Sequence, residues 1–246
     1  MLFEKQPAVF HITHHKAGSQ WIKEVLRQST SGRLIRPQPL SKHLTSNPLV
    51  QGKIYPTVYM NKSEFDDLLQ QQETAIDLRK FYLIRDLRDT LVSLYFSLKF
   101  SHKAVSENVK RQKSALEGLD VESGLIYLIN NGLRSQARRQ TSWQDSDIEM
   151  FRYEDLINDE LSVFKKIFSL CEIKISHRNL EKIVTKNSFK QKTKGRNPGE
   201  EDVKKHERKG ISGDWQNHFT PEVEDEFKRV FAGTLIETGY ETDDSW

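Results

Sequence analysis

Residues 14–19 read His-His-Lys-Ala-Gly-Ser, a short basic loop whose groups could bind an anion. The ammonium of Lys16, the hydroxyl of Ser19 and the backbone N–H groups are donors that a phosphate-like oxygen accepts from. An amphipathic helical pattern begins near Trp21, so the loop would lie at a helix N-terminus, where unpaired N–H groups and the helix dipole favour negative charge. The GxxxxGK[ST] spacing of ATP-binding phosphate loops is absent. The loop therefore predicts a phosphate-like anion site; an ordinary strand-to-helix turn is the alternative.

Two further cationic positions could form a second anion site. Arg85 ends an apolar run, and Ser93 follows eight residues later in a predicted helix. An arginine can hold a phosphate through two parallel N–H bonds, to which a hydroxyl adds another. Arg208, Lys209 and Gly210 stand together, and the glycine lets backbone N–H groups approach an anion closely. The alternatives are a surface arginine beside an unrelated serine, and a solvated basic loop.

An aromatic residue, Phe189, stands just before the most cationic stretch of the chain, residues 190–210. Its ring could stack on a purine base, and a core phenylalanine is the alternative. Two anion sites and one aromatic wall are what a nucleotide with phosphates at both ends of its ribose requires.

The elements that must position these groups are strands and helices in alternation. Apolar runs predict strands at residues 8–13, 53–60, 81–85 and 148–153. Helical patterns follow at residues 21–26, 63–69, 86–98, 121–139, 159–171, 176–185 and 221–234. Such alternation predicts a mainly parallel sheet, in which strand ends and the next helix starts meet at the ligand-binding edge. Pro56 favours an edge position for its strand. Residues 100–120 are polar and basic, which predicts a mobile surface segment.

Composition indicates a globular protein of 246 residues with a net charge of +3, too mildly basic for a nucleic-acid coat. The single cysteine, Cys171, excludes an internal disulfide and a cysteine-based zinc site, and its apolar neighbours predict that it is buried. No apolar run reaches the ~18 residues that span a membrane. The first residues lack the layout of a secretory signal, so a cytoplasmic location is expected.

These stretches, in this order, resemble the sulfotransferases that use 3′-phosphoadenosine 5′-phosphosulfate (PAPS). The family's phosphosulfate loop reads roughly Pro-Lys-Ser-Gly-Thr-Thr-Trp, and residues 15–21 read His-Lys-Ala-Gly-Ser-Gln-Trp. The family's strand-end arginine and helix serine match Arg85 and Ser93, and its Tyr-Glu-Asp matches residues 153–155. Its Ser-Phe matches residues 188–189, and its Arg-Lys-Gly-x-x-Gly-Asp-Trp-x-x-x-Phe-Thr, the most specific motif, matches residues 208–220.

The resemblance implies one sulfotransferase domain over residues 1–246, with a core sheet at about 8–160 and a cofactor-covering segment at about 186–220. The implied fold is an α/β three-layer sandwich with a central, mainly parallel β-sheet flanked by helices, similar to the P-loop NTPases. The implied reaction transfers a sulfuryl group from PAPS to a hydroxyl or amine, with a carbohydrate or small alcohol as a possible acceptor, and releases PAP (EC 2.8.2 class).

The resemblance also assigns the parts of the cofactor to residues. The 5′-phosphosulfate would be held by Lys16, Ala17, Gly18, Ser19, Gln20 and Trp21. The 3′-phosphate would be held by Arg85, Ser93, Arg208, Lys209 and Gly210. The adenine would face Tyr153, Asn187, Ser188 and Phe189, with Trp21 nearby.

Catalysis would need a general base and a cation at the leaving oxygen, and Lys16 is the residue expected to supply that cation. Family members carry a histidine at the end of the strand before Arg85's strand, where this chain has Val58 or Tyr59. His14 or His15 in the loop is then the favoured base, and a carboxylate from an acceptor-side loop is equally open. His11 could be buried in its strand, and His43 lies in a loop. No paired-carboxylate metal site stands out, so no metal is expected.

Two other functions stay open at this point: a P-loop-type kinase of a small molecule or nucleotide, and a non-catalytic nucleotide-binding protein. The kinase would need a GK[ST] loop and a magnesium carboxylate, neither of which is apparent. No nucleic acid partner and no transmembrane segment are expected, and the sequence does not reveal the acceptor or the oligomeric state. The basic stretches 103–113 and 190–209 could attract an anionic acceptor or cover the cofactor.

Overall fold

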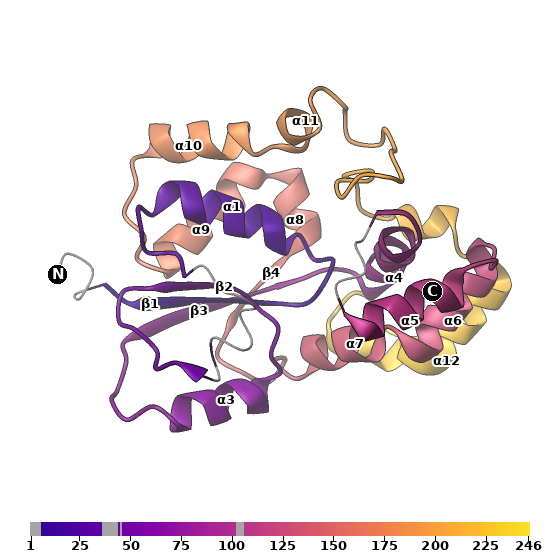
Figure 1. Cartoon of the computed structure of the whole chain (residues 1–246), viewed down its shortest axis with the longest axis horizontal. Coiled ribbons are helices and arrows are strands. Elements are labelled where there is room, and N and C mark those ends of the chain that lie inside the picture. Colours follow the sequence, from indigo (N-terminus) through magenta and orange to yellow (C-terminus); the bar gives the residue numbers. More distant parts are fainter. Residues whose placement is uncertain (1–5, 36–43, 45, 102–105) are drawn as a thin grey trace.

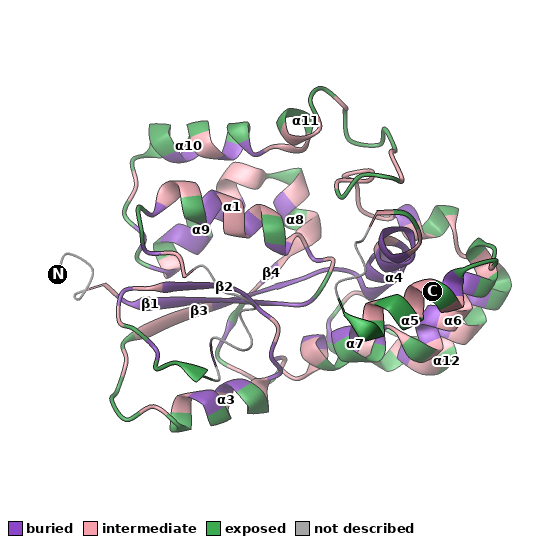
Figure 2. Ribbon diagram, viewed as in Figure 1, coloured by how far each residue is buried: buried purple, intermediate pink, exposed green. Residues whose placement is uncertain are grey.

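A four-stranded parallel sheet in the order β2-β1-β3-β4 is the centre of the molecule, in a computed structural model that describes residues 6–35, 44, 46–101 and 106–246 (Figure 1). The strands are β1 (Ala8–Thr13), β2 (Ile54–Val58), β3 (Leu78–Ile84) and β4 (Glu149–Arg152). All residues of β1 and β2 are buried, as expected for strands covered on both faces (Figure 2). The predicted parallel sheet is confirmed, and the Pro56 strand β2 lies at its edge.

Helices cover both faces of the sheet and give the expected three-layer α/β fold. One face carries α1 (Ser19–Ser29), α8 (Tyr153–Asn158), α9 (Glu160–Leu170) and α10 (His177–Lys186), and the opposite face carries α3 (Lys62–Gln70) (Figure 1). Alternate side chains of β1 supply the two cores: Val9 packs with α1 and α9, whereas Phe10 and Ile12 pack with α3. Cys171 and His11 are buried, as predicted.

A third helical group lies beyond the carboxyl ends of the strands (Figure 1). It contains α4 (Leu87–Phe96), α5 (Glu107–Leu116), α6 (Val121–Asn131), α7 (Arg134–Thr141) and α12 (Pro221–Glu237). A π-helical turn, η1 (Ser97–Ser101), continues α4. These helices share one apolar cluster, and Pro221 begins α12 after the Thr220 cap, as its sequence position predicts.

Several expected element boundaries are wrong. The single helix expected at residues 121–139 is two helices, because the chain turns at Gly132 and the buried Leu133 begins α7 in a new direction. Tyr153 starts α8 instead of ending β4. The segment at residues 100–120, expected to be a mobile surface loop, contains α5, whose Ser106 side chain caps the helix by accepting from the Val109 N–H. Residues 102–105 and His43 lie outside the described residues.

The chain between α11 (Phe189–Lys192) and the 3₁₀ turn η2 (Asp214–Asn217) has no regular structure, as its composition predicts. We call residues 193–213 the strap, because they run from the α10 side of the sheet to α4 (Figure 1). Among the described residues, no helix combines the length and apolar character that crossing a bilayer requires.

Candidate active site

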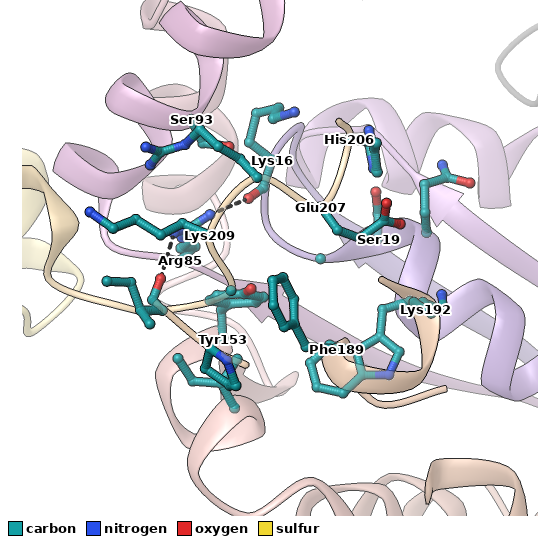
Figure 3. Close-up of a pocket in the computed structure, with 18 of the residues that line it drawn as sticks. Lys16, Ser19, Arg85, Ser93, Tyr153, Phe189, Lys192, His206, Glu207 and Lys209 are labelled. Carbon is teal, nitrogen blue, oxygen red and sulfur yellow. Dashed lines mark hydrogen bonds between the residues drawn. The ribbon is translucent and has the colours of Figure 1, made fainter. Parts of the chain in front are cut away.

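Three stretches far apart in the sequence meet at the carboxyl edge of the sheet, and Arg85 joins them. Arg85 follows β3, and its Nη1 donates to the carbonyl of Lys16 at 3.2 Å. Its Nη2 donates to the carbonyl of Ile211 in the strap, also at 3.2 Å (Figure 3). The guanidinium stacks on the ring of Tyr153, with 4.5 Å between its carbon and the ring centroid. One buried cation therefore fixes the loop after β1, the strap and α8 together.

These stretches enclose a cavity of about 270 Å³. Most of the predicted site residues line it: His15, Lys16, Gly18, Ser19, Gln20, Trp21, Arg85, Ser93, Tyr153, Asn187, Phe189, Arg208, Lys209 and Gly210. His14, Ala17 and Ser188 do not line it, although each is adjacent to a residue that does. Tyr59 also lines it, and residues that the sequence analysis did not single out complete the wall: Ile157, Glu160, Lys192, Pro198, His206, Glu207 and Ile211.

The loop between β1 and α1 presents its backbone to the cavity. Gly18 has φ +80° at the N-cap position of α1, and a Cβ there would come within 2.9 Å of the Tyr153 ring. No side chain of the described residues caps α1, and its first turn carries no acidic residue. The first N–H groups of the helix therefore keep their capacity to bind an anion. Lys16 also takes a left-handed conformation, with φ +72°.

Lys16 is the cation of this loop, and its electrostatic neighbours are the arginines of the second predicted anion site. Burial, and then the positive charges of Arg85 and Arg208, lower the pKa of Lys16 to about 8, while the charge of Glu207 acts in the opposite direction. The two cationic groups predicted from separate motifs are therefore close enough to serve one ligand. Figure 3 shows Lys16 beside Arg85, with the Lys209 side chain extending away from Lys16.

Asp214 and Asp89 hold the strap and its cations in place. Arg208 and Lys209 both donate to the Asp214 carboxylate, the lysine at 2.5 Å, and Arg208 also pairs with Glu201. Burial raises the pKa of Asp214, but hydrogen bonds from His218, Lys209 and Arg208 outweigh it and hold that pKa well below its usual range. Asp89 of α4 accepts from the N–H groups of Gly213 and Trp215 at 2.8 and 3.0 Å and lies 3.6 Å from the Arg85 guanidinium.

A glycine in the strap lets an aromatic ring approach. Gly210 has φ +68°, and a Cβ there would collide with the ring of Phe189. The Arg196 guanidinium also lies over the Phe189 ring, 5.3 Å from the ring centroid. Arg196 donates to the carbonyls of Glu207 and Arg208. A side chain at either Gly18 or Gly210 would fill part of the cavity, so the two glycines are what its shape requires.

The two histidines of the loop have different environments. His14 is fully buried: its Nδ1 lies 2.9 Å from the carbonyl of His15, and its Nε2 accepts from the Arg85 backbone N–H at 3.2 Å. Gln140 Nε2 lies 2.9 Å from the same Nε2. Burial lowers the pKa of His14 to about 3, so the ring is neutral and the Nδ1 carries the proton. Both nitrogens bind protein groups, an arrangement that positions Arg85.

His15, in contrast, is exposed and lines the cavity. Its ring lies over that of Tyr59, with 4.0 Å between centroids, and the Tyr59 hydroxyl is 2.9 Å from the Ser19 hydroxyl. Tyr59 follows β2 after Thr57, whose φ of +59° turns the chain at the sheet edge. Of the two residues expected near the position of the family's histidine, Tyr59 lines the cavity and Val58 is buried in the core. The sequence analysis named Tyr59 only as a residue near the expected histidine position and gave it no role.

The described residues contain no group of three or more His, Cys, Asp or Glu side chains arranged to hold a metal ion. A parallel sheet with a strand–loop–helix anion site and a cationic strap over its carboxyl edge defines the P-loop-like class of α/β proteins. A family model for the sulfotransferase domain matches residues 6–239, and the chain belongs to this family. The resemblance drawn from the motifs is thereby confirmed.

Relatives and solved structures agree with this assignment. A 3-alpha-hydroxysteroid sulfotransferase of Cavia porcellus is 25% identical over 89% of this chain and 80% of its own length. A flavonol sulfotransferase-like protein of Flaveria bidentis is 24% identical over 96% of this chain and 84% of its own. The crystal structure of mouse sulfotransferase SULT7A1 complexed with PAP matches with a TM-score of 0.68 at 18% identity, covering 95% of this chain and 85% of that one.

Proposed function

We propose that this chain transfers a sulfuryl group from PAPS to a hydroxyl or amine of an acceptor and releases PAP. The observation that carries the proposal is that Lys16, Arg85 and Arg208 lie around one cavity. A bisphosphorylated adenosine needs a cationic group near each of its two phosphates. The sulfotransferase SULT7A1, which matches 95% of this chain, was solved with PAP, and this supports the same cofactor here.

In this proposal, the loop residues Lys16 to Trp21 bind the 5′-phosphosulfate through the lysine, the hydroxyl of Ser19 and the N–H groups that begin α1. Arg85, Ser93, Arg208, Lys209 and Gly210 bind the 3′-phosphate. Tyr153, Asn187, Ser188 and Phe189 face the adenine together with Trp21. Ala17 and Ser188 would contribute through the backbone, since neither lines the cavity.

The chemistry assigned to the chain's own residues is proton transfer and charge stabilisation. His15 accepts the proton of the acceptor hydroxyl, whose oxygen forms a bond to sulfur while the bond from sulfur to the bridging oxygen breaks. Lys16 stabilises the negative charge that develops on that bridging oxygen. His14, closed off by Arg85 and Gln140, acts as a positioning residue. A carbohydrate or a small alcohol is the acceptor class we propose to test first.

Two measurements test the function. Thermal unfolding with PAP, with PAPS and with ATP–Mg²⁺ separates a sulfotransferase from a kinase: the first two ligands should raise the melting temperature by mass action without added metal, and ATP–Mg²⁺ should do little. PAPS that carries a radioactive label in its sulfuryl group is then incubated with a panel of acceptors. Lys16→Ala should abolish transfer to every acceptor, and near-wild-type transfer by this variant would refute the role of Lys16.

The single cysteine fits a cytoplasmic setting, which we include in the proposal. Cys171 is buried, and burial raises the pKa of its thiol to about 12, so it stays protonated and unreactive. Fractionation of cells that express the protein would test the location.

A further inference from the structure

Glu160 lines the cavity, but neither the motifs nor the mechanism uses it. It is the first residue of α9, and the spacing of Tyr153, Ile157 and Glu160 along α8 and α9 places three side chains on the same cavity wall. One turn further along α9, Phe164 packs edge-on against Trp21, with 6.1 Å between ring centroids. Glu160 therefore lies toward the Trp21 end of the cavity, the end that the proposed function gives to the base.

The carboxyl of Glu160 has no protein partner: among the described residues it makes no hydrogen bond and no ion pair. Burial raises the pKa of Glu160 to about 7, and no charged neighbour contributes to that shift. The pKa of Lys16, by comparison, responds to Arg85, Arg208 and Glu207. Glu160 is thus separate from the cations that would hold the phosphates, and it neutralises none of them.

Glu160 is also not needed to cap its own helix. The N-cap of α9 is Asp159, whose side chain accepts from the Ser162 N–H at 3.0 Å. The carboxyl lines a ligand cavity and neither caps its helix nor pairs with another described side chain, so its place there points to a hydrogen-bond donor on the ligand.

The amide of Asn187 and the ammonium of Lys192, also in the cavity wall, are not alternative acceptors. Asn187 donates to the carbonyl of Ile183 at 2.9 Å and accepts from Gln28 at 3.5 Å, so its amide is used within the protein. Lys192 is a donor only. The remaining wall is aromatic or apolar, namely Trp21, Tyr153, Ile157 and Phe189, and suits the faces of a purine.

We infer that Glu160 accepts a hydrogen bond from the exocyclic 6-amino group of the adenine and thereby selects adenine nucleotides over 6-oxopurine nucleotides. The inference rests on the proposed function and adds to it a residue that determines specificity. Both the ionised and the protonated carboxyl keep an oxygen that accepts from an amine. An ionised carboxylate opposite a 6-oxo group places two acceptors together and leaves both unpaired, whereas the protonated carboxyl can donate to that group, so the selection against 6-oxopurines should be strongest at a pH above the pKa of Glu160.

The experiment is a cycle of ligands and variants. Dissociation constants are measured by calorimetry for PAP, for inosine 3′,5′-bisphosphate and for purine riboside 3′,5′-bisphosphate, which lacks any 6-substituent. The wild type should bind PAP at least about tenfold more tightly than either analogue. Glu160→Ala should bind all three alike. Glu160→Gln should keep the preference for PAP over the purine riboside ligand, because its amide oxygen accepts from the amine, but should lose the preference over the inosine ligand, because its amide N–H can donate to the 6-oxo group. Glu181→Ala, on exposed α10, is the matched control and should behave as wild type.

The outcomes separate this inference from the proposed function. If the wild type binds PAP well but does not discriminate between the three ligands, or if Glu160→Ala keeps the wild-type ratio, the inference fails and the proposed function stands. If the wild type binds none of the bisphosphates, both fail. Because each comparison is a ratio of dissociation constants measured on the same variant, a general loss of stability in Glu160→Ala does not change the conclusion.

Discussion

The Arg85 guanidinium donates to the backbone carbonyl of Lys16 at 3.2 Å, so the cation of the second anion site holds the loop of the first. The two residues follow the neighbouring strands β1 and β3, whose parallel pairing ends at Thr13 and Leu83. The same guanidinium reaches Ile211 in the strap. We therefore expect binding at the two proposed sites to be coupled through this side chain.

Arg85→Lys tests this coupling. A lysine keeps the positive charge opposite Asp89 but cannot donate to Lys16 and Ile211 together. We expect PAP affinity to fall by about 2 kcal/mol or more, roughly 30-fold, measured by calorimetry. Arg27→Lys, an exposed change on α1 where Arg27 pairs with Glu24, serves as the control and should leave affinity unchanged. Wild-type affinity in Arg85→Lys would show that the bridging contacts carry no binding energy.

The pH dependence of catalysis should report Lys16. Its pKa is lowered to about 8 in the unliganded protein, chiefly by burial, and the leaving oxygen requires the protonated form. We therefore expect kcat/KM for PAPS to fall as pH rises through about 8, since this parameter reports the free enzyme.

Glu207→Gln removes a negative charge that raises the Lys16 pKa. The alkaline fall should then begin at a lower pH than in the wild type, and PAP should bind more tightly at neutral pH because one like charge leaves the anion site. An unchanged or upward-shifted alkaline limb in this variant would assign the titration to another group.

The loop histidines should separate into a catalytic and a positioning residue. His15→Ala should lower kcat by about 10²–10⁴-fold, the usual contribution of a general base, and added imidazole should restore part of the rate. The readout is single-turnover transfer with saturating PAPS.

His14→Ala should act through stability instead. It leaves the buried Arg85 N–H without its acceptor, which costs about 1–3 kcal/mol in the free energy of unfolding, measured with urea. Imidazole should not restore its rate, because His14 does not line the cavity. Rescue of His14→Ala by imidazole would reverse the two assignments.

Gly18→Ala and Gly32→Ala form a matched pair. Both glycines have positive φ, +80° and +70°, so both variants lose about 1–2 kcal/mol of stability from the backbone conformation. Only at Gly18 would the new Cβ meet the Tyr153 ring, whereas nothing lies within 4 Å of it at Gly32. Thermal unfolding should therefore show a loss in both variants that is larger in Gly18→Ala, and PAP affinity should drop in Gly18→Ala alone. Equal PAP affinities would argue against a close fit at the loop.

The sequence predicted what local patterns control. Apolar runs located the four strands. Residue types predicted separate anion sites at Lys16, Arg85 and Arg208, and the family resemblance predicted that these sites serve one cofactor. The features that the sequence did not predict depend on how side chains pack in the folded chain. The burial of His14 depends on Gln140, 126 residues away, and the break after α6 depends on how Leu133 enters the core. Glu160 and Glu207 carry no motif, and only the folded chain brings them to the cavity.

Asp214 gives the strap an internal counterion. Without a ligand, Arg208 and Lys209 both pair with this carboxylate and Arg208 also pairs with Glu201, so an empty site does not leave two unpaired cations side by side. The departure of a multiply charged product then exchanges one set of ion pairs for another, which lowers the barrier to emptying the site. Because the product PAP closely resembles the donor PAPS, this exchange of ion pairs would govern how fast PAP leaves and the next PAPS binds.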